Sequence, residues 1–346
     1  MKGMMVSRRA CLHRLGTGVL ALGVAGGPLA AATLVGCAAP ATPLTIAWHP
    51  WPGYAPLQLA HSQGWWEGLP LQRLATGSAS ESLAQLRAGR AQAAALTLDE
   101  VLTAHASGLA LRVVAVFDLS EGADVVLARP ERSTPPSWRG ARLGHEAGAV
   151  GTLMATAWLD AAGLQPEDVQ MVHIPFDQHE AAWARDEVDV LVTFEPVATR
   201  LQQRGAVRIF DSSLLPADTA IVHVLAVHPR ALDTHPAAGY ALLRHIFAAQ
   251  RHLHTLPVDS AYRLSPWLGL PRETVLASFR GLRLTDWADN RAWLVGAQPR
   301  LPAAAAALAR VMHANAQLPS ADAPVSLSAA DWLPTDAPTV HLEAGA

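Results

Sequence analysis

The stretch LTLDEV at residues 96–101 has a near-copy, VTFEPV, at residues 192–197. Each is followed by a second matching segment, VFDLS at residues 116–120 and IFDSS at residues 209–213. In both series an apolar run of strand type leads through threonine into acidic residues and a helical pattern. We therefore expect two structurally related halves, although convergent patterning of strand–helix units would leave the same echo.

On either side of these stretches, short apolar runs alternate with longer amphipathic segments. This alternation predicts an α/β protein in which mainly parallel sheets are flanked by helices. The predicted strands are 44–48, 91–97, 111–117 and 125–128, then 141–145, 169–173, 189–193 and 207–210. The predicted helices are 55–63, 79–88 and 98–106, then 150–163, 178–185 and 195–203, and finally 236–254, 271–280 and 299–315.

Two similar strands bracket the middle of the chain. VLARP at residues 126–130 and VLAVHP at residues 224–229 both run from an apolar strand into a proline-containing turn. If the chain crosses between halves at these strands, they form a hinge on which the halves can close around a ligand. The predicted lobes are 44–127 plus 226–318, and 130–223, with a tail, 319–346, lying loosely on the surface.

The N-terminus has the pattern of an export signal. Four basic residues occur in the first fourteen, and residues 15–36 carry no charge. A basic start, an apolar stretch and a small-residue cleavage site define a secretory signal, predicted here as residues 1–36. Arg8-Arg9 is also compatible with a twin-arginine signal. A transmembrane anchor is the alternative, but six glycines and Pro28 make this stretch a poor helix.

Leu34-Val35-Gly36-Cys37 resembles the lipobox of bacterial lipoproteins. The resemblance implies that Cys37 is lipidated and that residues 37–43 form a linker to the folded protein. The only other cysteine is Cys11, inside the signal, so the mature chain would have no free thiol and no disulfide.

Composition excludes several function classes. Without residues 1–36, 22 arginines face 29 acidic residues, and this negative balance argues against nucleic acid as a partner. The chain has no Gly-x-Ser-x-Gly sequence, and Lys2 is its only lysine, so a P-loop is excluded. The histidines are scattered, and the pair His252 and His254 favours a solvated role over a metal site. We expect no cofactor, no metal and no catalysis.

Residues 48–57, WHPWPGYAPL, follow the first predicted strand, and GWW follows at residues 64–66. Together with the acidic stretch 118–124 and the glycine-rich stretch 144–151, they resemble periplasmic solute-binding proteins of ABC importers, of the nitrate, sulfonate, taurine and thiamin-precursor type. The resemblance implies a two-lobed type II periplasmic-binding-protein fold with the ligand in the cleft. It also implies a lipid-anchored or soluble periplasmic form, with an ABC permease and its ATPase as partners. We expect a monomer on the periplasmic face that contacts the membrane only through its lipid anchor.

Ligands of open α/β sheets bind beyond the carboxyl ends of the strands. Trp51 and Tyr54 could stack there on a planar or cationic group, or only pack beside the prolines. Ser78 and Ser80 open a helix, where they could hold an acceptor group or only cap the helix. The residues predicted to bind the ligand are Trp51, Tyr54, Ser78, Ser80, Thr97, Asp118, Glu146, Ala149, Val150 and Glu195.

The nature of the ligand stays open between two chemistries. The resemblance points to a sulfonate, nitrate or taurine, but no basic residue stands at the predicted cleft positions. Glu146 and Glu195 are instead suited to an amine or to the N–H of a nitrogen heterocycle. Two other functions remain open. One is an enzyme like the thiamin-pyrimidine-precursor synthases, which by resemblance share this fold but carry a cysteine-rich motif that is missing here. The other is an extracytoplasmic ligand sensor.

Overall fold

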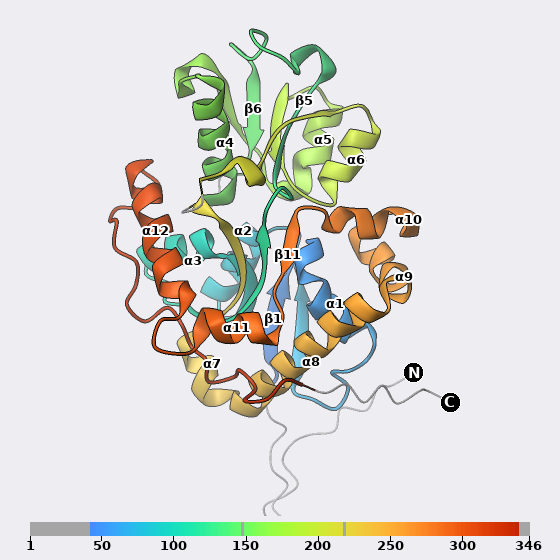
Figure 1. Ribbon diagram of the computed structural model, residues 1–346, viewed down its shortest axis with the longest axis vertical. Coiled ribbons are helices and arrows are strands. Elements are labelled where there is room, and N and C mark those ends of the chain that lie inside the picture. The colour runs from blue at the N-terminus through green and yellow to red at the C-terminus, as the bar shows by residue number, and fades with distance from the viewer. Residues whose placement is uncertain (1–41, 147–148, 217–218, 339–346) are drawn as a thin grey trace, which may run out of the picture. The chain divides into compact units, whose positions relative to one another are not determined.

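The computed structural model describes residues 42–146, 149–216 and 219–338, which form two mixed β-sheets with helices on their faces (Figure 1). The predicted signal and Cys37 lie outside the described residues. The first sheet has the order β11-β4-β10-β3-β1-β2, and the second has the order β7-β6-β8-β5-β9. The first contains β1 (Leu44–Trp48), β2 (Leu71–Ala75), β3 (Ala93–Thr97), β4 (Arg112–Ser120), β10 (Ile221–Val227) and β11 (Leu282–Leu284). The second contains β5 (Val125–Ala128), β6 (Arg142–His145), β7 (Gln170–His173), β8 (Val190–Thr193) and β9 (Val207–Asp211).

The two sheets share one topology. The order β2-β1-β3-β10-β4 in the first sheet corresponds to the order β7-β6-β8-β5-β9 in the second. Within each of these five-strand orders one strand, β10 or β5, runs antiparallel to the other four. The sequence echoes fall on equivalent elements, the first on β3 and β8 and the second on β4 and β9. The α/β class is confirmed, and we name each sheet with its helices the first and the second lobe.

Each inserted strand reaches its sheet directly after the chain has crossed from the other lobe. The first crossing follows β4, at residues 121–124, and the second follows β9, from Ser212 on, because β5 pairs along its whole length in the second sheet and β10 in the first. This corrects the predicted crossings within 126–130 and 224–229, because residues 126–128 belong to the second sheet alone and residues 224–227 to the first sheet alone. Ser212 joins the two crossings, since its Oγ lies 2.8 Å from Ser120 Oγ and accepts from the N–H of Gly122 at 2.7 Å.

Helices cover both faces of each sheet. On the first lobe α1 (Ala55–Ser62), α8 (Pro236–Thr255) and α9 (Pro257–Leu268) pack on one face, and α2 (Ala79–Arg87), α3 (Leu98–Ala106) and α12 (Arg300–Ala314) on the other (Figure 1). On the second lobe α4 (Ala149–Ala162) lies opposite α5 (His179–Ala184) and α6 (Val197–Gln203). The remaining α-helices are α7 (Pro229–Thr234), α10 (Arg272–Val275) and α11 (Trp287–Leu294).

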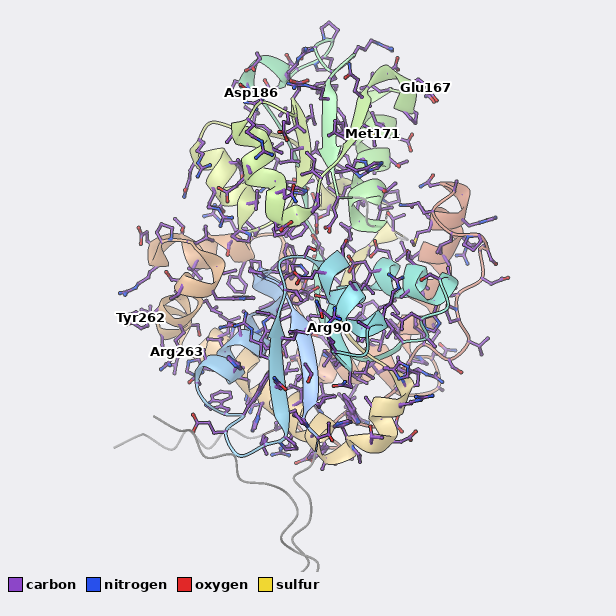
Figure 2. The ribbon with its side chains drawn as sticks, turned by 180° about the vertical axis from the view of Figure 1, so that it is seen from behind. Arg90, Glu167, Met171, Asp186, Tyr262 and Arg263 are labelled. Atoms are coloured by element: carbon purple, nitrogen blue, oxygen red, sulfur yellow. The ribbon has the colours of Figure 1, made fainter. Side chains whose placement is uncertain are left out.

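Most predicted elements are present within a few residues of their predicted ends, and the elements that were not predicted are β2, β11, α7, α9 and α11. Strand β2 was not foreseen, because at the edge of the first sheet its residues are only partly buried and show no apolar run. At the corresponding edge of the second sheet, Met171 of β7 stays 37% exposed (Figure 2). An edge position alone does not hide a strand, because β7 was predicted as 169–173.

The C-terminal segment is integrated into the first lobe up to Pro338, which corrects the prediction of a loosely lying tail. Leu327 and Ala329 hydrogen-bond through their backbones to Val113 of β4. Trp332 is fully buried against α8, where Gly239 leaves the space that the indole fills. A Cβ on Gly239 would stand 2.0 Å from the Trp332 ring, so this glycine is required by close approach.

Candidate functional site

A small cavity lies between the lobes, at the carboxyl ends of their parallel strands, where ligands bind in open α/β sheets. Its volume is about 30 Å³, room for one or two water molecules, so a larger solute requires the walls to move apart. Residues from the first lobe that line the cavity are His49, Trp51, Tyr54, Ala79, Thr97, Glu100 and His223. Those from the second lobe and the crossing are Asp124, Glu146, Val150, Gly151, His179, Val192 and Phe194.

Aromatic rings from both lobes form one wall. Trp51, which follows β1, meets Phe194 of the second lobe edge-on, with ring centres 5.3 Å apart. Phe194 stacks in turn on Phe176 at 3.9 Å, and Tyr54 lies edge-on to His49 at 5.4 Å. Such rings supply apolar surface and negative faces that suit a flat or cationic solute.

The pair of Asp118 and His223 stands beneath this wall. In the antiparallel register, His223 of β10 lies opposite Thr97 of β3 and Asp118 of β4. His223 Nδ1 is 2.8 Å from Asp118 Oδ1, and Asp118 Oδ2 accepts from Trp51 Nε1 at 3.3 Å. The imidazole also stacks on the Trp51 indole, with ring centres 4.5 Å apart.

This pair favours a charged histidine. Burial alone would lower the pKa of His223, but the carboxylates of Asp118, Asp124 and Glu100 outweigh that effect and raise it. Gly53 makes the arrangement possible, because a Cβ there would stand 1.8 Å from Asp118 Oδ2.

Three carboxyl groups face the cavity, one each from α3, the first crossing and the loop after β6. Burial, reinforced by Asp99, raises the pKa of Glu100 to about 8, and burial raises that of Asp124 to about 6. Burial also raises the pKa of Glu146, against the opposing effect of its hydrogen bond from Ser80. Asp124 is 2% exposed, and its Oδ2 has no hydrogen-bond partner among the described residues. A carboxyl group in that state is ready to accept a hydrogen bond from a solute.

Two further histidines of the cavity are held neutral. Burial, with a contribution from His223, lowers the pKa of His49 to about 3. Burial lowers that of His179 to about 4, although its Nε2 lies 3.1 Å from the Ile174 carbonyl oxygen. None of the fourteen lining residues is a lysine or an arginine, so His223 supplies the positive charge at this site.

One hydrogen bond ties the lobes together beside the cavity. Ser80 Oγ, at the start of α2, donates to Glu146 Oε1 at 2.8 Å. Gly151 lets α4 approach the same loop, because a Cβ there would stand 2.3 Å from the carbonyl oxygen of Glu146. The cavity is thus closed by direct contact of the lobes.

Comparison with known protein families identifies the family of this chain. The model of the NMT1-like family matches residues 37–263, about two thirds of the sequence. The chain belongs to the NMT1-like family. No curated protein matches it.

The solved structures that this NMT1-like protein resembles share its fold. The alkanesulfonate-binding protein SsuA from Xanthomonas axonopodis pv. citri, bound to MOPS, has a TM-score of 0.68 and 19% identity, over 84% of this chain and 99% of that one. The periplasmic nitrate-binding protein NrtA from Synechocystis PCC 6803 has a TM-score of 0.65 and 14% identity, over 85% and 87%. The Candida albicans CA3427 product, described as having the generic periplasmic binding protein fold, has a TM-score of 0.61 and 12% identity, over 81% and 92%. The predicted periplasmic-binding-protein fold is confirmed.

Half of the residues predicted to bind the ligand line the cavity of this NMT1-like protein. They are Trp51, Tyr54, Thr97, Glu146 and Val150. Ala149 begins α4, and its side chain lies outside the described residues. Two more support the lining without joining it, since Ser80 bonds Glu146 and Asp118 pairs with His223.

The other two predicted residues are engaged elsewhere. Ser78 caps α2 by accepting from the N–H of Glu81 at 3.2 Å. Glu195 accepts from the backbone and the hydroxyl of Thr199, at 3.0 and 2.9 Å, so its carboxylate is held on the first turn of α6 and does not line the cavity. A carboxylate at a helix start is a common cap, and the sequence offers this signal in the threonine four residues after Glu195.

Several lining residues were missed, above all His49, Glu100, Asp124, His179 and His223. Asp124 and Glu100 stand in acidic stretches that sequence reasoning noted without placing their side chains. His223 directly precedes the predicted strand stretch 224–229, but a strand pattern does not reveal which residues lie beside it in the sheet. Within residues 42–146, 149–216 and 219–338, no three His, Cys, Asp or Glu side chains are grouped so that they could hold a metal ion.

Proposed function

We propose that this protein is an extracytoplasmic solute-binding lipoprotein that captures a small amine or nitrogen heterocycle between its lobes and delivers it to an ABC importer. One observation carries the choice of ligand: the interlobe cavity presents Glu100, Asp124 and Glu146 together with aromatic rings, and no lysine or arginine. Carboxyl groups accept hydrogen bonds from N–H groups, and ring faces attract cations. The sulfonate and nitrate named for the structural relatives would instead meet three acids.

Binding follows the two-lobed construction. With the lobes apart, the solute enters from the side and contacts the aromatic wall of Trp51 and Tyr54. Closure then brings Glu146 and Phe194 of the second lobe against it, and the ligand's differential affinity for this form favours it. The importer recognises the closed form, and ATP is hydrolysed by the importer's ATPase.

We infer no catalytic step for this site. The chain has two cysteines, Cys11 and Cys37, so residues 38–346 contain no cysteine-rich motif of the kind that such a synthase uses. A ligand sensor would use the same cavity. It differs from a transport protein in that no permease would bind the loaded form.

Proton release on binding tests the ligand class. We expect native mass spectrometry of freshly purified mature protein to reveal a retained basic nitrogen compound. Calorimetry with primary amines and amino-substituted nitrogen heterocycles, in buffers of different ionisation enthalpy, should show protons leaving the protein, because a cation lowers the raised pKa values of Glu100 and Asp124. Taurine and nitrate should not bind.

Asp124→Asn provides the matched variant, with Glu187→Gln, on the surface of the second lobe, as its control. We expect Asp124→Asn to weaken amine binding at least tenfold, since a hydrogen bond to a charged group contributes about 1.5–3 kcal/mol, and Glu187→Gln to change nothing. Tight binding of taurine or nitrate with proton uptake would overturn the ligand class, and failure of every solute to bind would overturn the transport function.

A further inference from the structure

We propose a second ligand site on the first lobe, a pocket that takes an amphiphilic anion with an apolar body. This pocket has a volume of about 730 Å³ and shares no lining residue with the interlobe cavity. It lies where α8, the short helix Leu276–Phe279, the edge strand β11 and α11 meet. Pockets that hold small organic ligands measure about 300–1,000 Å³, so its size is that of a ligand site.

The walls of the pocket are mostly apolar. Phe247 and Leu253 are buried on α8, and Leu284 comes from β11. Phe279 and the half-buried Trp287 add aromatic surface. Exposed Leu276 and Pro257 stand at the rim, so the pocket opens to water. An apolar ligand body would gain about 25 cal/mol for each Å² that it removes from water here.

Arg251 gives the pocket its charge selectivity. One guanidinium nitrogen of Arg251, Nη2, is buried without a hydrogen-bond partner among the described residues. None of the aspartates or glutamates that the structure describes forms an ion pair with Arg251. Of the neighbouring polar residues, His254 is exposed, and two others are engaged elsewhere. Gln250 donates to the carbonyl oxygen of Thr285, and Asp286 caps α11 by accepting from the N–H of Asp289 at 2.8 Å.

An unpaired buried guanidinium nitrogen is costly, and a carboxylate or sulfonate head group would satisfy it. The occupant that fits both features is therefore a monoanion with an alkyl or aromatic body. Such a ligand would bind whether or not the interlobe cavity is filled, so this site is independent of the proposed transport function.

Decanoate is the probe that tests the site, with decylammonium as its charge-reversed counterpart. Calorimetry on the full mature protein should show one decanoate bound per chain and at least tenfold weaker binding of decylammonium. Arg251→Gln should weaken decanoate binding about tenfold or more. Arg244→Gln, on the same helix but with its guanidinium over Tyr240, should bind as the wild type does.

Ala288→Trp tests the same pocket by bulk rather than charge. Ala288 is exposed at the rim on α11, so a tryptophan there should block decanoate while the thermal unfolding midpoint stays near that of the wild type. Amine binding in the interlobe cavity should be unaffected in both pocket variants. Absence of decanoate binding, equal affinity for decylammonium, or a protein dimer that Arg251→Gln dissociates would each overturn the proposal.

Discussion

Asp118 holds two side chains of the cavity wall without reaching the cavity itself. It is fully buried, and its two oxygens contact His223 Nδ1 and Trp51 Nε1. A buried carboxylate keeps the imidazole charged and fixes which ring nitrogen faces away from it. At the scale of single residues, this pair sets both the charge and the orientation of the aromatic wall.

Asp118→Asn should lower the pKa of His223 below its ordinary value, because burial then acts with less opposition. Imidazole signals in two-dimensional NMR spectra measure this directly. Since the folded-state pKa of His223 is raised, the pair stabilises the fold below the ordinary histidine pKa of about 6.5, and this contribution disappears as pH rises through the folded-state value. The loss of stability in the variant should therefore be largest in acid.

His179 serves as the internal control in the same spectra. It is equally buried but bonds to Thr193 and to a backbone carbonyl, so its titration should not change in Asp118→Asn. An unaltered His223 titration in the variant would show that Asp118 does not govern its charge.

Between elements, the hydrogen bond from the start of α2 to the loop after β6 joins the lobes directly. Glu146, its acceptor, is buried where the lobes meet, and this burial raises its pKa. The opening of the lobes proposed above would expose Glu146, so we expect closure to take up protons. It is favoured below the ordinary glutamate pKa of about 4.3 and becomes less favourable as pH rises through the higher value of the closed form.

Ser80→Ala should shift the ligand-free protein toward the open form, by about 0.5–1.5 kcal/mol, the usual contribution of one hydrogen bond. Small-angle X-ray scattering should record a larger radius of gyration for the variant than for the wild type at the same pH. Glu146→Gln, which keeps an acceptor but does not titrate, should reduce the pH dependence of that radius. A radius independent of both substitutions and of pH would rule out this contact as a closing element.

At the scale of the whole molecule, the proposed lipid anchor concerns a segment outside the described residues. Among residues that the structure describes, no helix has the length and apolarity needed to cross a bilayer. We propose that a lipid on Cys37 attaches the protein to the membrane, because a pair of acyl chains anchors more stably than a single one.

Cys37→Ser should abolish lipidation and leave the protein unattached to membranes. Fractionation of cells, with mass spectrometry of the mature N-terminus, measures both outcomes. Cys11→Ser is the matched control, because Cys11 lies in the predicted signal and its loss should leave attachment intact. A cleaved Cys37→Ser protein that still sediments with membranes would count against a lipid anchor.

How much of the fold could be predicted differs by region. Strands such as β1 and β8 are local apolar runs, and their series repeats, so the α/β class and the duplicate halves follow from pattern alone. The crossings were predicted a few residues too late. Both β5 and β10 are short apolar strands, and their sequences do not show which sheet each one joins. The partners of an inserted strand are distant in sequence and leave no local signal.

The amino-acid sequence by itself determined the alternation of strands and helices, the two related halves and the aromatic and acidic character of the loops at the strand ends. Tertiary structure alone decided which of these side chains meet. It set His223 between Thr97 and Asp118 through an antiparallel register. The reason is physical: periodicity reports whether a residue is buried, whereas its neighbours depend on pairings between segments about a hundred residues apart.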